Sequence, residues 1–183
     1  MQVLVDHCWG RFGMRTGDRV IEVGAADGHL LSLFKERGAS TLGFEAAENL
    51  SKLAADKDIP VVNALFTKES LGLVPADFRS TQLVVMLHTF DHIYDPAPFL
   101  DTVRQVLDPK RQEIYLKHET AIFGHEHATY LHFGSMSRLL KRHGLRVVDF
   151  NFLPKGMCRG ASMLVAATPE GSEIAGAPGL ASF

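Results

Sequence analysis

The chain has 183 residues, of which 46% are hydrophobic and 22% charged, and its formal net charge is -2. This length and composition fit one globular α/β domain and exclude a disordered chain. There is no basic block typical of a nucleic-acid-binding face, and no apolar run approaches the roughly 18 residues that a membrane span needs. We therefore expect a small-molecule partner, with no nucleic acid and no membrane.

The cysteine pattern bears on metal binding and on compartment. Cys8 and Cys158 stand far apart and have no CxxC companion. This spacing disfavours a zinc site and favours two reduced thiols in a cytoplasmic protein. The first residues lack the charged-then-apolar pattern of a signal peptide. The sequence gives no indication of oligomeric state.

The first half of the chain alternates between predicted helices and strands. Residues 2–14 are predicted as a short amphipathic helix, and the β-branched run 19–23 as a buried strand that ends in glycine. A helix opens at Asp27-Gly28 and closes at Gly38. The next predicted elements are a strand at 41–45, a helix at about 47–55, and strands at 60–63 and 82–87.

The second half continues this alternation. A helix over 96–107 begins after Asp95, a good N-cap before proline. The later predicted elements are a strand at 113–117, a helix at 134–143, and strands at 145–150 and 161–167. The pattern predicts a Rossmann-like, doubly wound α/β fold with a seven-stranded, mostly parallel sheet. Because no helix is predicted between the last two strands, we expect the last strand to run antiparallel.

The domain organisation follows from these elements. Residues 1–168 are expected to form the single domain. Residues 169–183 are rich in Gly, Ala, Ser and Pro, and we expect them to form a flexible C-terminal tail.

A candidate ligand loop, Glu22-Val23-Gly24-Ala25-Ala26-Asp27-Gly28, lies between a predicted strand and helix. Ligands of open α/β sheets bind beyond the carboxyl ends of the strands. Gly24 permits a sharp turn, and Gly28 is expected to let a ligand approach the backbone. The GxGxxG spacing of a dinucleotide site is absent, and Asp27 stands where a pyrophosphate needs uncharged N–H groups. Carboxylates here suit a ligand that brings an ammonium and a sulfonium.

Glu45 lies at the end of the second predicted strand. A carboxylate there can accept hydrogen bonds from both ribose hydroxyls of an adenosine. We therefore expect the loop and Glu45 to bind an adenosine-containing cofactor, with Asn63 and Leu65, after the third strand, bordering the adenine. The competing interpretation is an ordinary turn with a surface glutamate.

The segment GDRVIEVGAADGHLLSLFKERGASTLGFEAAENL resembles the first half of a class I S-adenosylmethionine-dependent methyltransferase, and in particular the sugar C-methyltransferases of deoxysugar biosynthesis. The likeness continues in Leu87-His88-Thr89-Phe90-Asp91-His92, at the segment after the fourth strand that borders the methyl group. It resumes at His125-Glu126-His127-Ala128-Thr129-Tyr130 and again at 160–162, and it covers most of residues 14–167. The resemblance implies S-adenosyl-L-methionine as cofactor.

The same resemblance implies roles for individual residues. Leu87 and His88 would border the cofactor, and the substrate-binding residues would be His92, His125 and Tyr130. His127 would be the general base, and Glu126 would position the substrate. Histidine titrates near neutral pH and suits removal of a proton beside a carbonyl or from a hydroxyl. In a strand-like segment His125 and His127 would share a face opposite Glu126.

The sequence departs from this family in three ways. Gly124 stands where the family has a tyrosine near the substrate, and these 183 residues carry neither the family's N-terminal zinc module nor its C-terminal domain. The resemblance therefore supports methyl transfer to carbon or oxygen of a small molecule more than it supports a nucleotide-sugar substrate.

Three alternatives remain open. One is a non-catalytic cofactor-binding module, and another is a nucleotide-dependent Rossmann oxidoreductase, which the glycine spacing disfavours. The third is a metal site formed by His118, His125, His127 and His132. Because no cysteine or aspartate partner is spaced nearby, we expect no metal.

Overall fold

The computed structural model of the protein describes residues 1–108, 113–119, 128, 131–150, 162–178 and 180. The α-helices are α1 (Gln2–Phe12), α2 (His29–Glu36), α3 (Glu48–Ala55), α4 (Pro96–Val106) and α5 (Phe133–Arg142). The short 3-10 helices are η1 (Glu69–Leu73), η2 (Ala76–Ser80) and η3 (Phe90–His92). The strands are β1 (Arg19–Val23), β2 (Ser40–Phe44), β3 (Val61–Val62), β4 (Leu83–Leu87), β5 (Glu113–Glu119), β6 (Leu145–Phe150) and β7 (Ser162–Pro169).

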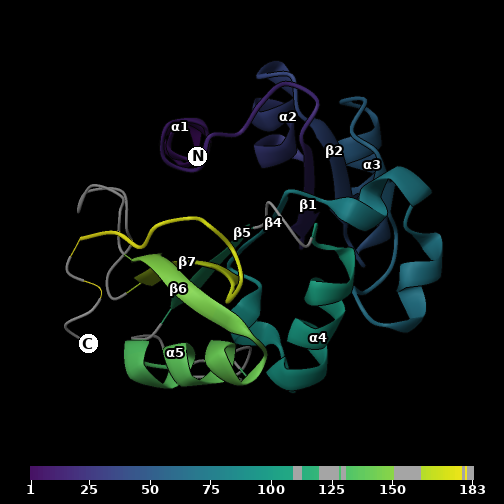
Figure 1. Cartoon of the computed structure of the whole chain (residues 1–183). Coiled ribbons are helices and arrows are strands. Elements are labelled where there is room, and N and C mark those ends of the chain that lie inside the picture. The colour runs from purple at the N-terminus through teal and green to yellow at the C-terminus, as the bar shows by residue number, and fades with distance from the viewer. Residues whose placement is uncertain (109–112, 120–127, 129–130, 151–161, 179, 181–183) are drawn as a thin grey trace.

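One sheet organises the molecule, with its strands in the order β3-β2-β1-β4-β5-β7-β6. The pairs among β1 to β5 are parallel, and β7 runs antiparallel to both β5 and β6. Helices α1, α2 and α3 lie on one side of the sheet, and α4 and α5 lie on the other (Figure 1). The predicted doubly wound fold with an antiparallel last strand is confirmed. None of the helices in the described ranges combines the length and apolar character needed to cross a bilayer.

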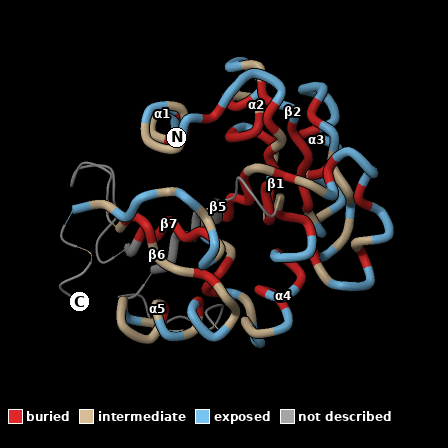
Figure 2. Tube along the Cα trace, viewed as in Figure 1, coloured by how far each residue is buried: buried red, intermediate tan, exposed pale blue. Residues whose placement is uncertain are grey.

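Buried residues follow the strands and parts of the helices (Figure 2), and they form two hydrophobic clusters, one on each side of the sheet. Side chains alternate in direction along a strand. Val20 and Val85 therefore join the cluster under α1 and α2, while Ile21 and Val84 join the cluster under α4 and α5. Parallel strands covered on both faces need near-continuous apolar runs, which is the pattern that marked them in the sequence. Glu22 is the one acidic residue in the buried run of β1.

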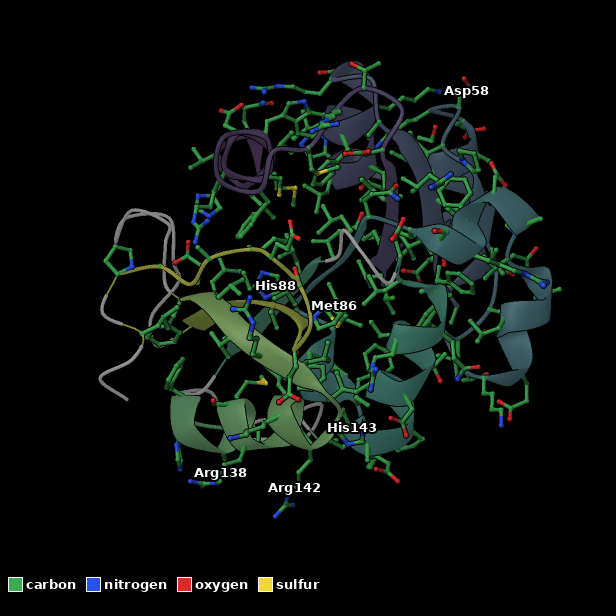
Figure 3. All side chains as sticks on the ribbon, in the orientation of Figure 1. Asp58, Met86, His88, Arg138, Arg142 and His143 are labelled. Carbon is green, nitrogen blue, oxygen red and sulfur yellow. The ribbon has the colours of Figure 1, made fainter. Side chains whose placement is uncertain are left out.

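Side chains set the starts of two helices. The Asp95 carboxylate accepts a hydrogen bond from the amide of Ala97 at 3.2 Å, as the N-cap prediction for α4 requires. His132 caps α5, because its Nδ1 accepts from the amide of Gly134 at 3.1 Å. The outer side of α5 carries Arg138 and Arg142, which point away from the domain (Figure 3).

The connection between β3 and β4 departs from the alternation of strand and α-helix. Parallel strands are usually joined by a crossover that carries an α-helix. Here the crossover holds only η1 and η2, each five residues long. Pro75 and Gly72 lie within this stretch and disfavour a continuous helix. Two single-turn helices cover less of a sheet face than an α-helix of several turns, so this face of the sheet is covered less completely beside α4.

The described part of the predicted tail lies against the domain and does not extend away from it. The Arg146 guanidinium donates to the carbonyl oxygens of Ser172 and Ile174, and the amide of Ala177 donates to the carbonyl of Val148 at 2.7 Å. These contacts run along β6, which is the edge strand of the sheet. Covering an edge in this way removes a row of unpaired backbone groups.

Candidate functional site

The loop Gly24–Gly28 joins β1 to α2 at the carboxyl end of β1. This strand lies between β2 and β4, where the strand order reverses and open α/β sheets bind their ligands. Gly24 has a φ of 74°. A Cβ on Gly24 would lie 2.3 Å from Oγ1 of Thr89, which follows β4. Glycine is therefore required here by backbone conformation and also by the close approach of the β4 end.

The backbone amides of this loop are turned toward β2. The amides of Gly24 and Ala25 donate to the carbonyl of Phe44 at 2.9 and 3.0 Å, and the amide of Ala26 donates to Oε2 of Glu45 at 2.9 Å. The amide of Gly28 donates to the carbonyl of Ala25. In a phosphate-binding loop such amides point at the anion instead. This loop is therefore fastened to the end of β2 and does not form an anion cradle.

Glu45 is held in a fixed orientation at the end of β2. Besides the Ala26 contact, its Oε1 accepts from the amide of Ala47 at 2.8 Å. A carboxylate has about four acceptor positions, so hydrogen-bonding capacity remains for a ligand. Asn63 supports the same corner, because its Nδ2 donates to the carbonyl oxygens of Glu45 and Ala46 at 2.8 and 3.1 Å.

Glu22 is a buried carboxyl close to the loop, with 5% of its surface exposed. Its Oε2 has no hydrogen-bond partner among the described residues. Burial raises the pKa of Glu22 well above its ordinary value, and the nearby carboxylates of Asp27 and Glu45 raise it further. The folded protein therefore favours the protonated form of Glu22.

Asp27 is already paired with a cation of the protein. Its Oδ2 accepts a hydrogen bond from Nζ of Lys57, which follows α3, and its Oδ1 accepts from the amide of His29 at 3.3 Å. The Lys57 contact is the main reason that the pKa of Asp27 lies below its ordinary value. Asp27 thus anchors the start of α2 to the segment after α3, a structural role that the sequence did not reveal.

Two glycines fit the loop against its neighbours. A Cβ on Gly28 would lie 3.1 Å from Cβ of Ala54 and 3.3 Å from Ile59, so the open side of Gly28 faces α3. Packing against α3 therefore gives Gly28 a structural reason to be glycine, beside the predicted approach of a ligand. Gly43 in β2 was missed, yet a Cβ on it would lie 2.7 Å from Cβ of Ala25. Glycine at 43 lets the loop pack directly on the strand.

A cleft of about 740 Å³ opens beside the loop, on the α4 side of the sheet. Its lining comes from the ends of β1 and β2, the segment after β3, the segment after β4, and the first turns of α4. Of the predicted site residues, the cleft is lined by Gly24, Glu45, Leu65 and His92. The other described ones stand outside its lining, namely Glu22, Ala25, Ala26, Asp27, Gly28, Asn63, Leu87 and His88.

His88 and Thr89 form the turn at the end of β4. His88 is exposed and has a φ of 56°, a left-handed conformation that is uncommon outside glycine. Figure 3 labels it near Met86, a buried residue of β4. Thr89 lines the cleft and contacts Gly24, although the sequence singled out only its neighbours. Backbone strain that collects at such a turn is typical of functional sites.

The predicted catalytic residues His127 and Glu126 lie outside the described residues, as do His125, Tyr130 and Gly124. Of the four histidines weighed as metal ligands, His132 uses its Nδ1 to cap α5. In the ranges that the structure describes, no three His, Cys, Asp or Glu side chains gather closely enough to hold a metal ion.

Comparisons with known proteins agree on one family. Residues 4–149 match the model of a methyltransferase domain. The C-methyltransferase NovU of Streptomyces niveus is 31% identical over an alignment that covers the whole chain, but the chain spans only 45% of that relative's length.

Solved structures show the same fold. An S-adenosylmethionine-dependent methyltransferase from Mesorhizobium loti matches with a TM-score of 0.69 at 16% identity, covering 90% of this chain and 95% of that one. The 1,6-didemethyltoxoflavin-N1-methyltransferase of Burkholderia thailandensis, solved with 1,6-didemethyltoxoflavin and S-adenosylhomocysteine, matches with a TM-score of 0.68 at 13% identity, covering 92% and 76%.

Proposed function

The chain belongs to the methyltransferase domain family, and we propose that it transfers a methyl group from S-adenosylmethionine to a carbon or oxygen atom of a small molecule. The observation that carries this proposal is the commitment of the loop amides to Phe44 and Glu45. A loop whose amides are used internally offers little to a pyrophosphate, so the oxidoreductase alternative loses its binding site. Carboxylates and an open cleft remain, and they suit a cationic nucleoside.

The cofactor fits the residues present in three places. Glu45 has acceptor capacity left for ribose hydroxyls and lines the cleft. Leu65 and Phe44 offer apolar surface for the adenine in the same cleft. The methionine end would then extend over Gly24 and the following loop, where Glu22 and Asp27 would accept hydrogen bonds from its ammonium. When bound, S-adenosylmethionine supplies an electrophilic methyl group on a sulfonium.

The chain's own contribution to the chemistry is orientation and proton removal. Methyl transfer is an in-line displacement, so the acceptor atom must be held close to the methyl carbon and away from water. We assign His127 as the general base and Glu126 as the group that positions the acceptor. Ala128, the next residue, donates its amide hydrogen to the carbonyl of Asp91 at 2.8 Å. This bond ties Ala128 to η3, whose His92 lines the cleft.

The kind of atom that accepts the methyl group is also part of the proposal. NovU, whose name describes a C-methyltransferase, favours a carbon acceptor beside a carbonyl. The Burkholderia enzyme acts at a ring nitrogen of a small heterocycle, so the same fold serves several acceptors. Proton removal beside a carbonyl is a task for a histidine base. We place this activity in the cytoplasm, where a buried thiol such as that of Cys8 stays reduced.

Calorimetry with S-adenosylhomocysteine tests the cofactor site. Glu45→Ala removes charged hydrogen bonds worth about 1.5–3 kcal/mol, so the Kd should rise about 10- to 150-fold. Glu48→Ala is the matched control, since Glu48 is an exposed glutamate in a salt bridge with Lys52 outside the cleft. Equal affinities in the two variants would remove Glu45 from the site.

A turnover assay separates the enzyme from the non-catalytic module. Labelled S-adenosylmethionine is offered with a library of small ketones and alcohols, and methylated product is measured. Tight cofactor binding without transfer to any member of a library that serves related enzymes would favour the binding module. Binding of NADH with no affinity for S-adenosylhomocysteine would restore the oxidoreductase alternative.

A further inference from the structure

Thr89 has a side-chain oxygen beside Gly24, where β1 ends and the ligand loop begins. A Cβ on Gly24 would lie 2.3 Å from Oγ1 of Thr89, and the three heavy atoms nearest to that position all belong to Thr89. Its Oγ1 is the closest of the three, so the hydroxyl group is turned toward the loop. Thr89 is half-buried, and both residues line the cleft. The oxygen therefore lies at the edge of the space that a ligand of the loop would enter.

The backbone on both sides of Thr89 holds this side chain in place. Directly before it, His88 has a φ of 56°, a left-handed conformation that is unfavourable for a residue with a Cβ. Directly after it, η3 begins, and the amide of His92 donates to the carbonyl of Thr89 at 3.1 Å. An unfavourable backbone conformation persists only where the surrounding structure enforces it, and such positions cluster at functional sites.

The hydroxyl of Thr89 has acceptor capacity that the fold does not use. Thr89 is the N-cap residue of η3, a position where a threonine oxygen usually accepts a hydrogen bond from a helix amide, but its side chain makes no such bond. Its hydroxyl instead donates to the carbonyl of Leu87 at 3.2 Å. A hydroxyl has one hydrogen to donate and two lone pairs that accept. Within the described ranges no donor is hydrogen-bonded to this oxygen, so its lone pairs are available to a ligand.

The proposed cofactor site, on which this inference rests, indicates which ligand group lies beside this oxygen. With the ribose at Glu45 and the methionine end over the loop, the sulfonium that joins them lies beside Gly24. A sulfonium withdraws electrons from its methyl group, so the methyl hydrogens carry partial positive charge. An oxygen with available lone pairs attracts such hydrogens in a weak C–H···O hydrogen bond. Once the methyl group has been transferred, neither these hydrogens nor the positive charge on sulfur remains.

From these observations we infer that Thr89 is a positioning residue for methyl transfer, whose Oγ1 accepts a C–H···O hydrogen bond from the methyl group of S-adenosylmethionine. In-line displacement requires the bond from sulfur to the methyl carbon to point at the acceptor atom. An oxygen fixed beside Gly24 restricts the direction of that bond. The same contact distinguishes the cofactor from its product, because S-adenosylhomocysteine has no methyl group on its sulfur. Thr89 therefore favours the binding of the cofactor over the binding of the product.

Calorimetry on the full chain with three ligands tests this role. At the methyl position S-adenosylhomocysteine has no group, S-adenosylmethionine has the methyl group, and sinefungin has an amino group. Thr89→Val removes the oxygen and keeps the shape of the side chain. The Kd for S-adenosylmethionine should rise about two- to fivefold, and the Kd for sinefungin, which loses a charged hydrogen bond, should rise about tenfold or more. The Kd for S-adenosylhomocysteine should change by less than about 1.5-fold.

Three further variants separate the oxygen from the shape of the side chain. Thr89→Ser keeps the oxygen and should restore the affinities for S-adenosylmethionine and sinefungin to within about twofold of wild type. Thr16→Val is the matched control, because it makes the same substitution at an exposed position outside the cleft, and it should change none of the three affinities. Thr89→Ala removes the oxygen without adding volume, so it should give the same order of effects even if Thr89→Val fails to fold.

The outcomes distinguish this inference from the proposed function. Equal weakening of all three ligands by Thr89→Val would show that Thr89 only packs against Gly24. That result, or three unchanged affinities, would overturn the role of Thr89 and leave the proposed function intact. If S-adenosylhomocysteine fails to bind the wild-type chain, the proposed function falls and this inference falls with it.

Discussion

Hydrogen bonds hold the end of the cleft at Gly24. The end at Thr102 consists of aromatic rings and of Thr102 itself, whose hydroxyl is already hydrogen-bonded to the carbonyl of Pro98. At the first end, the Glu45 carboxylate accepts hydrogen bonds from the amides of Ala26 at 2.9 Å and Ala47 at 2.8 Å. At the second end, Phe66, Phe99 and Thr102 offer an apolar surface. A polar end fixes how a ligand is oriented, because a mismatched hydrogen bond is costly. An apolar end limits ligand size and is tolerant of chemical variation.

The largest expected effect concerns the proposed base, His127. Replacing His127 by Asn should lower kcat by about 10²–10⁴-fold, the usual contribution of general-base catalysis. The affinity for S-adenosylhomocysteine should stay nearly constant, because a general base acts on the acceptor and not on the cofactor. The kcat of the variant should also lose its dependence on a group that titrates near neutral pH.

His132→Asn is the control for the His127 experiment, since it replaces another histidine of the same region that caps α5. Asparagine is also a good N-cap, so this variant should keep both stability and turnover. Wild-type turnover in His127→Asn would show that the substrate loses its proton without help from this residue.

The polar end of the cleft, at Gly24, should tolerate substitutions less well than the apolar end at Thr102. Gly24→Ala places a Cβ 2.3 Å from Thr89 Oγ1 and forces alanine to a φ of 74°. The left-handed conformation costs about 1–2 kcal/mol, and the overlap adds about 1–3 kcal/mol. Urea unfolding should therefore show a loss of about 2–5 kcal/mol.

Gly17→Ala separates these two costs. Gly17 has a φ of 86° and nothing within 4 Å of the position of a Cβ. This variant should lose only the conformational part, about 1–2 kcal/mol. It should also bind S-adenosylhomocysteine normally, whereas Gly24→Ala should not. Equal losses in the two variants would mean that the Thr89 contact relaxes at no cost.

The pH dependence of protein stability tests the protonation of Glu22, which lies close to the Gly24 end of the cleft. Burial raises its pKa in the folded state above the ordinary value of 4.5, so the folded protein holds a proton that the unfolded chain releases. This stabilisation is fully present below pH 4.5 and is lost as the pH rises through the folded-state pKa. Glu22→Gln does not titrate and avoids that loss.

The Tm of Glu22→Gln relative to wild type should therefore increase from about pH 5 to about pH 8. A gain of 1 kcal/mol corresponds to about 2–4 °C for a chain of this size. Glu48→Gln removes the same charge at the surface and serves as the control. A Tm difference for Glu22→Gln that is flat across this range would show that Glu22 is ionised in the folded protein.

Most of the polar end could be predicted from sequence, because its signals are local. Gly24 and Glu45 lie at the ends of strongly apolar strands, and such strands fix where the sheet edge falls. The apolar end gave no comparable signal. Phe66, Phe99 and Thr102 are ordinary core residues by type, and they line a cleft only because the crossover between β3 and β4 lacks an α-helix.

Other features missed by sequence reasoning depend on contacts between distant segments. The Asp27–Lys57 pair joins residues thirty positions apart, and Gly43 is required only because Ala25 packs on it. The contacts of the tail are also long-range, because Arg146 of β6 donates to the carbonyls of Ser172 and Ile174. Composition indicates how a segment behaves on its own, whereas these contacts are made with residues elsewhere in the chain.

The smallest expected effect lies within the loop, at Ala26. This alanine has a φ of 47°, and the left-handed conformation costs a residue with a Cβ about 1–2 kcal/mol. Glycine avoids that cost but loses about 0.5–1 kcal/mol of chain entropy. Ala26→Gly should therefore raise stability by about 0–1.5 kcal/mol, or by at most a few degrees in Tm. Because the hydrogen bond from its amide to Glu45 needs no side chain, affinity for S-adenosylhomocysteine should stay within about threefold.

Asp58→Gly is the matched variant for Ala26→Gly, since Asp58 has a φ of 59° and lies outside the cleft. Aspartate tolerates this conformation better than alanine does, and Asp58 also accepts a hydrogen bond from Lys35 at 2.7 Å. Asp58→Gly should therefore gain less stability than Ala26→Gly, or lose some. If Ala26→Gly is instead destabilised by more than about 1 kcal/mol, the loop holds alanine through packing that outweighs its backbone strain. The polar end would then be maintained by side-chain contacts as well as by hydrogen bonds.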